Sequence, residues 1–108
     1  MNGPYTLSYA TIDAVVTLRS PGVYELLVLY QGPVRYVGRS DDDLNARLKQ
    51  WVGSKYRYFT FEYCSSARDA FYKECTLYHQ HGGSKGLDND RHPDRPSGTD
   101  WKCPVCGR

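Results

Sequence analysis

Two tripeptides in the first half of the chain each place a tyrosine beside a glycine: Gly22–Tyr24 reads Gly-Val-Tyr and Tyr36–Gly38 reads Tyr-Val-Gly. A glycine lets a bulky partner approach the backbone closely, and a phenol can accept a proton in general base catalysis. Tyrosine is also a common strand residue, so the tripeptides alone are equally consistent with tyrosines at the edge of a core. Residues further along the chain decide between these interpretations.

A carboxylate occupies the apolar face of the helix that we expect from about residue 66 to residue 81. Glu74 falls in the middle of a stripe at i, i+3, i+4 spacing that comprises Ala67, Ala70, Phe71, Leu77 and Tyr78. An ionised carboxylate that faces a core is costly unless it is paired, hydrogen-bonded or bound to a metal. Glu74 is therefore a candidate metal ligand, and an ion pair with Arg47 is the alternative.

Cysteines near the end of the chain have the spacing of a zinc knuckle, in the sequence Cys103–Gly107. A structural zinc needs two further ligands, and the helix that carries Glu74 also has a cysteine and a histidine four residues apart on one face. We expect a single zinc site made of Cys75, His79, Cys103 and Cys106, which fixes the irregular tail to this helix. Rival ligands are Cys64, His81 and His92, and reduced or redox-active thiols are the alternative to zinc.

A hairpin must position the two tyrosines. The apolar run Val23–Tyr30 predicts a buried strand, residues 31–33 a turn, and Val34–Gly38 the returning strand. A three-residue loop would place Val28 opposite Tyr36, and strand alternation then puts Tyr24 and Tyr36 on the same face.

Two helices and a further strand complete the expected core. Asp41–Asp43 can cap a helix that carries Arg47 at the border of its apolar stripe and stops at Gly53. The aromatic-rich segment Tyr56–Tyr63 predicts a third strand. A capping box at Ser66 begins the helix that carries Glu74. The 108 residues thus form one domain, with an N-terminal extension (1–20), a core (21–90) and a zinc-binding tail (91–108).

The overall charge and hydropathy give only weak functional information. A net charge of +2 is no strong electrostatic signature of nucleic-acid binding. The longest apolar stretch, residues 26–30, is too short to span a bilayer, so we expect a cytoplasmic protein. Cytoplasmic cysteines are normally reduced, which favours a metal site over disulfides.

Five positions in the order found here resemble the GIY-YIG nuclease family. The name-giving tripeptides are similar to Gly22–Tyr24 and Tyr36–Gly38, the helical arginine to Arg47, the metal-binding glutamate to Glu74, and a downstream asparagine to Asn89. The resemblance covers residues 21–89, with one residue inserted before the arginine. Four residues after the arginine, members often carry His or Tyr, where this chain has a tryptophan that cannot accept a proton.

The resemblance implies an α+β fold with a three-stranded antiparallel sheet flanked by helices, and hydrolysis of a DNA phosphodiester with one Mg²⁺ or Mn²⁺ ion. The implied roles are metal binding by Glu74, stabilisation of phosphate charge by Arg47, water activation by Tyr24 with its pKa lowered by Arg39, positioning by Tyr36, and a loop or phosphate contact by Asn89. The sequence does not identify the structure of the DNA substrate: branched, nicked or otherwise structured DNA is one option, and specificity through a second copy or a protein partner stays open.

Two other classes of function remain open from the sequence. A non-catalytic nucleic-acid-binding module could retain the fold with zinc as a structural staple, and a protein-interaction domain could use the aromatic surface. The combination of Tyr24, Arg47 and Glu74 favours the nuclease, because a carboxylate without metal would repel phosphate.

Overall fold

Four antiparallel strands form the sheet at the centre of the computed structural model, which describes residues 1–108. They are β1 (Asn2–Thr6), β2 (Gly22–Leu27), β3 (Val34–Ser40) and β4 (Tyr58–Tyr63), and they lie in the order β1-β4-β2-β3. The helices are α1 (Tyr9–Val15), α2 (Leu44–Lys49), α3 (Ala67–Gln80) and α4 (Gly83–Gly86). The expected antiparallel α+β fold with flanking helices is confirmed.

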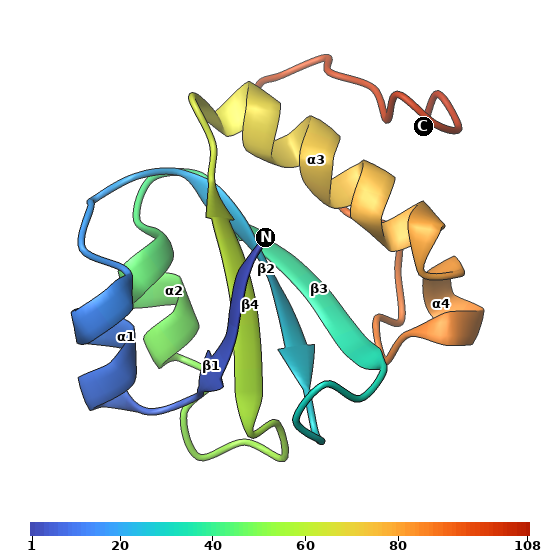
Figure 1. Ribbon diagram of the computed structural model, residues 1–108. Coiled ribbons are helices and arrows are strands. Elements are labelled where there is room, and N and C mark those ends of the chain that lie inside the picture. Colours follow the sequence, from blue (N-terminus) through green and yellow to red (C-terminus); the bar gives the residue numbers. More distant parts are fainter.

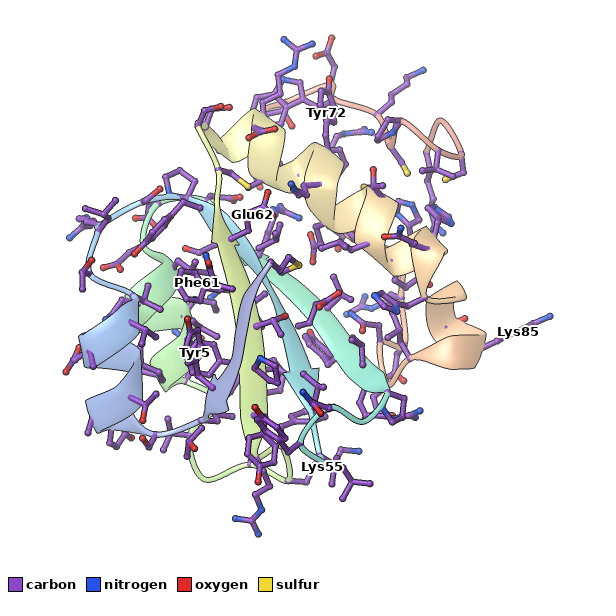
Figure 2. The ribbon with its side chains drawn as sticks, viewed as in Figure 1. Tyr5, Lys55, Phe61, Glu62, Tyr72 and Lys85 are labelled. Carbon is purple, nitrogen blue, oxygen red and sulfur yellow. The ribbon has the colours of Figure 1, made fainter.

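The number of strands differs from the expectation of three. β1, in the segment expected to be an extension, pairs with β4, with Asn2 opposite Phe61 and Tyr5 opposite Phe59. Figure 2 shows Tyr5 beside Phe61, and its ring centroid lies 5.7 Å from that of Phe59 and 6.1 Å from that of Phe61. Packing on an aromatic strand distant in the sequence therefore creates β1, which no local alternation predicts.

The helices cover the two faces of the sheet unequally. α1 and α2 lie together on one side and α3 crosses the other, and the C-terminal tail runs along α3 (Figure 1). Alternation along β2 divides the core accordingly: Tyr24 and Leu26 pack with the α1 and α2 residues, whereas Val23 packs with α3. None of these helices is long and apolar enough to cross a membrane.

The hairpin has a different register from the one expected. Tyr24 lies opposite Gly38 and Leu26 lies opposite Tyr36, because β2 ends at Leu27 and the following residues form a longer, exposed connection. The prediction that Val28 faces Tyr36 was wrong by two residues. A two-residue shift preserves strand parity, so both tyrosines still pack on the α1 and α2 side of the sheet.

Side-chain caps begin the helices where the sequence indicated. Asp43 accepts a hydrogen bond from the backbone N–H of Ala46 at 3.2 Å, and Ser66 accepts one from the N–H of Asp69 at 3.0 Å. The Asp69 carboxylate accepts in return from the N–H of Ser65, one residue before the N-cap whose N–H a capping box would use. These caps fix where α2 and α3 start, and with them the positions of their functional side chains.

Candidate active site and metal centre

A pocket of about 340 Å³ lies beside the edge strand β3, between α2, α3 and the segment that follows α4. Side chains from both faces of the sheet can meet here because no further strand covers this edge. All six residues expected to take part in catalysis line it: Tyr24, Tyr36, Arg39, Arg47, Glu74 and Asn89. They come from β2, β3, α2, α3 and the segment after α4.

Tyr24 is held rigidly at the base of the pocket. It is only 2% exposed, and its ring lies against Gly38, where an added Cβ would be 2.8 Å from Cε2 and closer still to Cζ. The Trp51 indole Nε1–H donates a 2.8 Å hydrogen bond to the Tyr24 hydroxyl oxygen. Glycine is therefore required at position 38 to seat the tyrosine ring.

The ionisation of Tyr24 differs from the expectation. Burial raises the pKa of Tyr24 above its ordinary value of 10, opposed by the hydrogen bond from Trp51 and the charge of Arg47. Arg39, which was expected to lower this pKa, instead binds two carboxylates. The cation that favours the Tyr24 phenolate is therefore Arg47.

Tyr36 lies half-buried beside the same tryptophan. Its ring centroid is 4.6 Å from that of Trp51. Burial, and next the negative charge of Glu74, raise the pKa of the Tyr36 phenol. Trp51 thus contacts both tyrosines, by a hydrogen bond to one and by ring packing with the other. Its position could have indicated this from the sequence, because members of the family that the chain resembles often carry His or Tyr four residues after the helical arginine.

Glu74 is 7% exposed and forms an ion pair with an arginine other than the one considered from sequence. Its Oε1 accepts a 2.6 Å hydrogen bond from Arg39 Nη1, and Arg39 Nε donates to Asp41 Oδ1 at 2.8 Å. Burial raises the pKa of Glu74 to about 6, and the charge of Arg39 only partly opposes this rise. The protein thus keeps a carboxylate in the pocket at a substantial electrostatic cost.

The free oxygen of Glu74 fits a divalent cation. No protein group donates to Oε2, and it is not sealed from solvent. The Asp41 carboxylate lines the same pocket. Mg²⁺ and Mn²⁺ prefer oxygen ligands, and Mg²⁺ typically binds through one or two carboxylates together with water and phosphate. The donor set of the pocket is therefore of the right chemical type.

Arg47 and Asn89 differ in whether their polar groups already make hydrogen bonds within the protein. Arg47 is exposed and makes no hydrogen bond or ion pair with the protein, so its donor fork is free. Asn89 is buried and makes two bonds with the backbone of Val37: its Oδ1 accepts from the N–H at 3.0 Å, and its Nδ2 donates to the C=O at 2.8 Å. Of the two roles considered for Asn89, the structure shows the holding of the loop.

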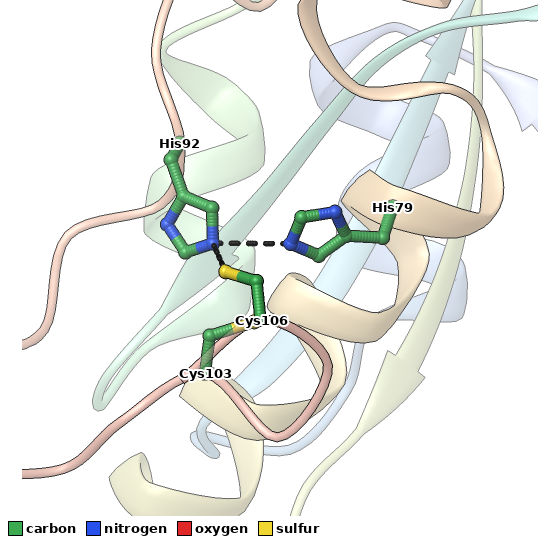
Figure 3. A group of neighbouring side chains, drawn as sticks. All are labelled: His79, His92, Cys103 and Cys106. Atoms are coloured by element: carbon green, nitrogen blue, oxygen red, sulfur yellow. Dashed lines mark hydrogen bonds between the residues drawn. The ribbon is translucent and has the colours of Figure 1, made fainter. Parts of the chain in front are cut away.

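A second cluster of side chains lies beside the pocket (Figure 3). Ligand atoms of His79, His92, Cys103 and Cys106 all lie within 4.8 Å of one another, and the four residues can hold a metal ion. The Nε2 atom of His92 is 3.2 Å from His79 Nε2 and 3.3 Å from Cys106 Sγ. Three of the four expected zinc ligands are therefore brought together.

Cys75 lies outside this cluster, and His92 takes its place. Cys75 is fully buried in a small apolar group with Phe71 and Cys103, where burial raises the pKa of its thiol. Cys75 and His79 both lie on the side of α3 that faces the tail, but Cys75 packs within this apolar group, whereas the ring of His79, one turn later, lies beside His92. The expected ligand set is therefore corrected by one residue.

The other rival ligands are also elsewhere. Cys64 packs in the core between the sheet and α3, and His81 Nε2 lies 2.9 Å from a carboxylate oxygen of Glu25. All four cysteines are free thiols. Burial raises the pKa of Cys103, but the backbone N–H groups of Cys106 and Val105, together with the side chains of His92 and Cys75, lower it to about 6. The thiolate, which is the metal-binding form, is thus favoured at Cys103.

Sequence reasoning missed several residues of the pocket. Asp41, Arg91 and Asp94 line it together with His92 and Pro93. Only the loop path after α4 brings the last four of these to the pocket, and no local pattern encodes that path.

Comparisons of the chain with protein-family models, with curated proteins and with solved structures found no match.

Proposed function

We propose that this chain is a metal-dependent DNA endonuclease of the GIY-YIG type that hydrolyses phosphodiester bonds in the pocket beside β3. One observation carries the proposal: Tyr24, Tyr36, Arg47 and Glu74, spread over 51 positions of the sequence, line a single pocket. They supply phenol hydroxyls, an unpaired guanidinium and a buried carboxylate with one free oxygen. Structural packing alone gives no reason for these groups to gather.

Each group suits one requirement of phosphodiester hydrolysis. A divalent cation held by Glu74 would neutralise charge on the phosphoryl oxygens. The free guanidinium of Arg47 can donate two parallel hydrogen bonds to the non-bridging oxygens. To accept the proton of the attacking water, Tyr24 must first lose its own hydroxyl proton to solvent; the Trp51 N–H and the charge of Arg47 favour the resulting phenolate, and burial opposes it. Tyr36 orients the water or the phosphate by hydrogen bonding.

A non-catalytic nucleic-acid-binding module is the second candidate, and the Arg39–Glu74 ion pair favours it. In this pair the carboxylate is already neutralised by a protein cation at 2.6 Å, so a metal ion must compete with Arg39 for Glu74. A pocket that binds phosphate through Arg47 and Arg91 does not need the competition to succeed. The two candidates therefore differ in whether Glu74 binds a divalent cation.

The test is cleavage of branched, nicked, single-stranded and plain duplex DNA with Mg²⁺ or Mn²⁺. We expect metal-dependent cleavage by the wild type and a loss of at least roughly 10²-fold in Glu74→Gln, the scale for removing one electrostatic contact to the transition state. Glu62→Gln is the matched control, because Glu62 also pairs with a cation near α3 but lies outside the pocket. Equal cleavage by Glu74→Gln contradicts the assigned mechanism, and DNA binding without cleavage by the wild type supports the binding module.

We also infer that the cluster of His79, His92, Cys103 and Cys106 binds a structural zinc ion. Two imidazoles and two thiols form one of the common ligand sets of closed, tetrahedral zinc sites. All four positions are filled by protein, which leaves no position for a reacting water. This zinc is therefore distinct in role from the cation at Glu74.

A further inference from the structure

The ligand atoms of His79, His92, Cys103 and Cys106 all lie within 4.8 Å of one another, and two of their separations are close to those of a tetrahedral zinc site. With bonds of about 2.0–2.3 Å, a tetrahedral zinc ion places neighbouring ligand atoms about 3.3–3.8 Å apart. The measured separations of His92 Nε2 from His79 Nε2 and Cys106 Sγ are 3.2 Å and 3.3 Å. His79, His92 and Cys106 are thus already about as close as a shared ion requires, and Cys103 lies within reach of the same ion.

The ring of His92 is oriented by a neighbouring carbonyl. Its Nδ1 lies 2.8 Å from the carbonyl oxygen of Pro93, an acceptor, so Nδ1 carries the proton and donates it. The lone pair is then on Nε2, the atom that faces His79 and Cys106. Metal-binding histidines commonly have this arrangement, in which the second ring nitrogen donates to a carbonyl or carboxylate.

A turn in the tail presents both cysteines to the histidines. The backbone N–H of Gly107 donates to the Cys103 carbonyl at 2.8 Å, and the N–H of Cys103 donates to the Arg108 carbonyl at 2.9 Å. Gly107 has a φ of +78°, which favours glycine. Trp101 packs against the apolar group of Phe71, Cys75 and Cys103 and places this turn on α3.

The same cluster holds one wall of the catalytic pocket. Residues 91–94 line the pocket. At the start of this segment, Asn89 is fixed to β3 by its two hydrogen bonds to Val37. From residue 90 to residue 94, no backbone hydrogen bond and no ion pair reaches another element, and only the hydrogen bonds of His92 leave the segment.

The burial of side chains also indicates that the cluster provides most of what holds the tail in place. Between residues 90 and 108 only two side chains are buried, and both belong to the cluster: His92 and Cys103. Little apolar burial therefore opposes the loss of conformational entropy in this segment. A metal ion that binds only the folded arrangement would supply the missing stabilisation.

We propose that zinc bound by His79, His92, Cys103 and Cys106 holds residues 90–94 in place as a wall of the catalytic pocket, so that zinc occupancy controls substrate binding there. The consequence for DNA cleavage rests on the proposed nuclease function. Zinc binding and the ordering of the wall do not depend on it.

The first experiment measures the metal. Protein purified without a tag should contain equimolar zinc, and replacement by Co²⁺ should give the visible bands of a tetrahedral site and a thiolate charge-transfer band. His92→Ala and Cys106→Ala should abolish both signals, whereas Cys75→Ala should retain them. Loss of zinc in Cys75→Ala with retention in His92→Ala would overturn the ligand set.

The second experiment measures how firmly residues 90–94 are held, through the rate of cleavage by trypsin. Trypsin cuts after arginine, and the bond between Arg91 and His92 lies in the segment, whereas Arg95 is protected by the proline that follows it. We expect slow cleavage after Arg91 in the zinc-loaded protein and rapid cleavage after removal of zinc or in Cys106→Ala. Cys106 is exposed, so this variant should keep the circular dichroism and the unfolding transition of the core. Equal cleavage with and without zinc would refute the inference.

Activity separates this inference from the nuclease proposal. If the wild type cleaves DNA, Cys106→Ala should lose about 10²-fold in kcat/KM, the effect expected when groups around the reacting centre are displaced by about 1 Å. Unchanged cleavage by a zinc-free variant would overturn the role of zinc at the pocket. If the wild type cleaves no DNA but zinc still protects the bond after Arg91, the nuclease proposal fails and the zinc-held wall stands.

Discussion

Replacing Glu74 by glutamine removes a charge that the fold buries beside the pocket while keeping the shape and one acceptor oxygen for Arg39. Burial raises the pKa of Glu74 to about 6, against an ordinary value of 4.5. Below pH 4.5 the carboxyl is protonated in both the native and unfolded states, and above pH 6 it is ionised in both. Between these values the native state holds more protons, so the free energy of unfolding falls as the pH rises.

The expected size of this effect is about 2 kcal/mol, from the difference between the two pKa values at 1.36 kcal/mol for each tenfold change. This value already includes the favourable ion pair with Arg39, because the ion pair contributes to the observed pKa. Glutamine does not titrate. The stability of Glu74→Gln relative to the wild type should therefore increase by about 2 kcal/mol between pH 4.5 and pH 7.

Urea unfolding monitored by circular dichroism, without added Mg²⁺ or Mn²⁺, measures this difference. The quantity to compare is the urea concentration at the midpoint of unfolding in the variant minus that in the wild type. This difference should be larger at pH 7 than at pH 4.5, by on the order of 1 M. Comparing the two proteins at each pH cancels the contributions of groups that do not interact with Glu74. Added Mn²⁺ should then stabilise the wild type but not the variant at pH 7. A stability difference that does not change with pH would refute this account of Glu74.

Three further substitutions test the positioning of the site. Gly38→Ala should destabilise the protein by about 1–3 kcal/mol in thermal unfolding, because the new Cβ overlaps the Tyr24 ring; an unchanged melting temperature would contradict this packing. Hydrogen bonds, first with Arg35, lower the pKa of Asp88 to about 2 from 3.8. Asp88→Asn should therefore cost about 2 kcal/mol at pH 7, and the cost should disappear as the pH falls through 2; a constant cost in acid would show another cause. Trp51→Phe removes the donor to Tyr24 and should lower stability by about 1 kcal/mol, while reducing any DNA cleavage more than the binding of DNA; equal losses in both would assign Trp51 to packing alone.

The resemblance to a known family named the candidate residues of the pocket, and local rules of helix and strand geometry predicted where some of them lie. Strand alternation put Tyr24 and Tyr36 on one face even though the register was wrong by two residues, because parity survives an even shift. The caps at Asp43 and Ser66 set the rotation of α2 and α3, and with it the side chains of Arg47 and Glu74. The sides on which Tyr24, Tyr36 and Glu74 lie were thus predicted without knowledge of tertiary contacts, whereas the partners of Arg39 and Cys75, which also lie in regular elements, were not.

Contacts between residues distant in the sequence determine the features that local geometry did not predict. β1 exists because Tyr5 packs on aromatic rings more than fifty positions away, and its own sequence shows no alternation. Arg39, rather than Arg47, pairs with Glu74 because it points from β3 toward α3, on the opposite face from Gly38. The replacement of Cys75 by His92 follows from the path of an irregular loop, which no periodicity describes.

Helix α3 carries residues of both proposed metal sites. Glu74 and His79 are five residues apart, which separates their directions by about 140° around the helix axis. Glu74 therefore faces β3 and its pocket, while His79 faces the tail. The part of the pocket on β2, β3, α2 and α3 rests on the apolar core, whereas residues 91–94 depend on the cluster. Segments with little burial open at lower free energy than the core. Removal of the metal ion or of one of its ligands should therefore release residues 91–94 from the pocket while the sheet stays folded. Perturbations of the apolar core should instead destabilise the sheet and this segment together.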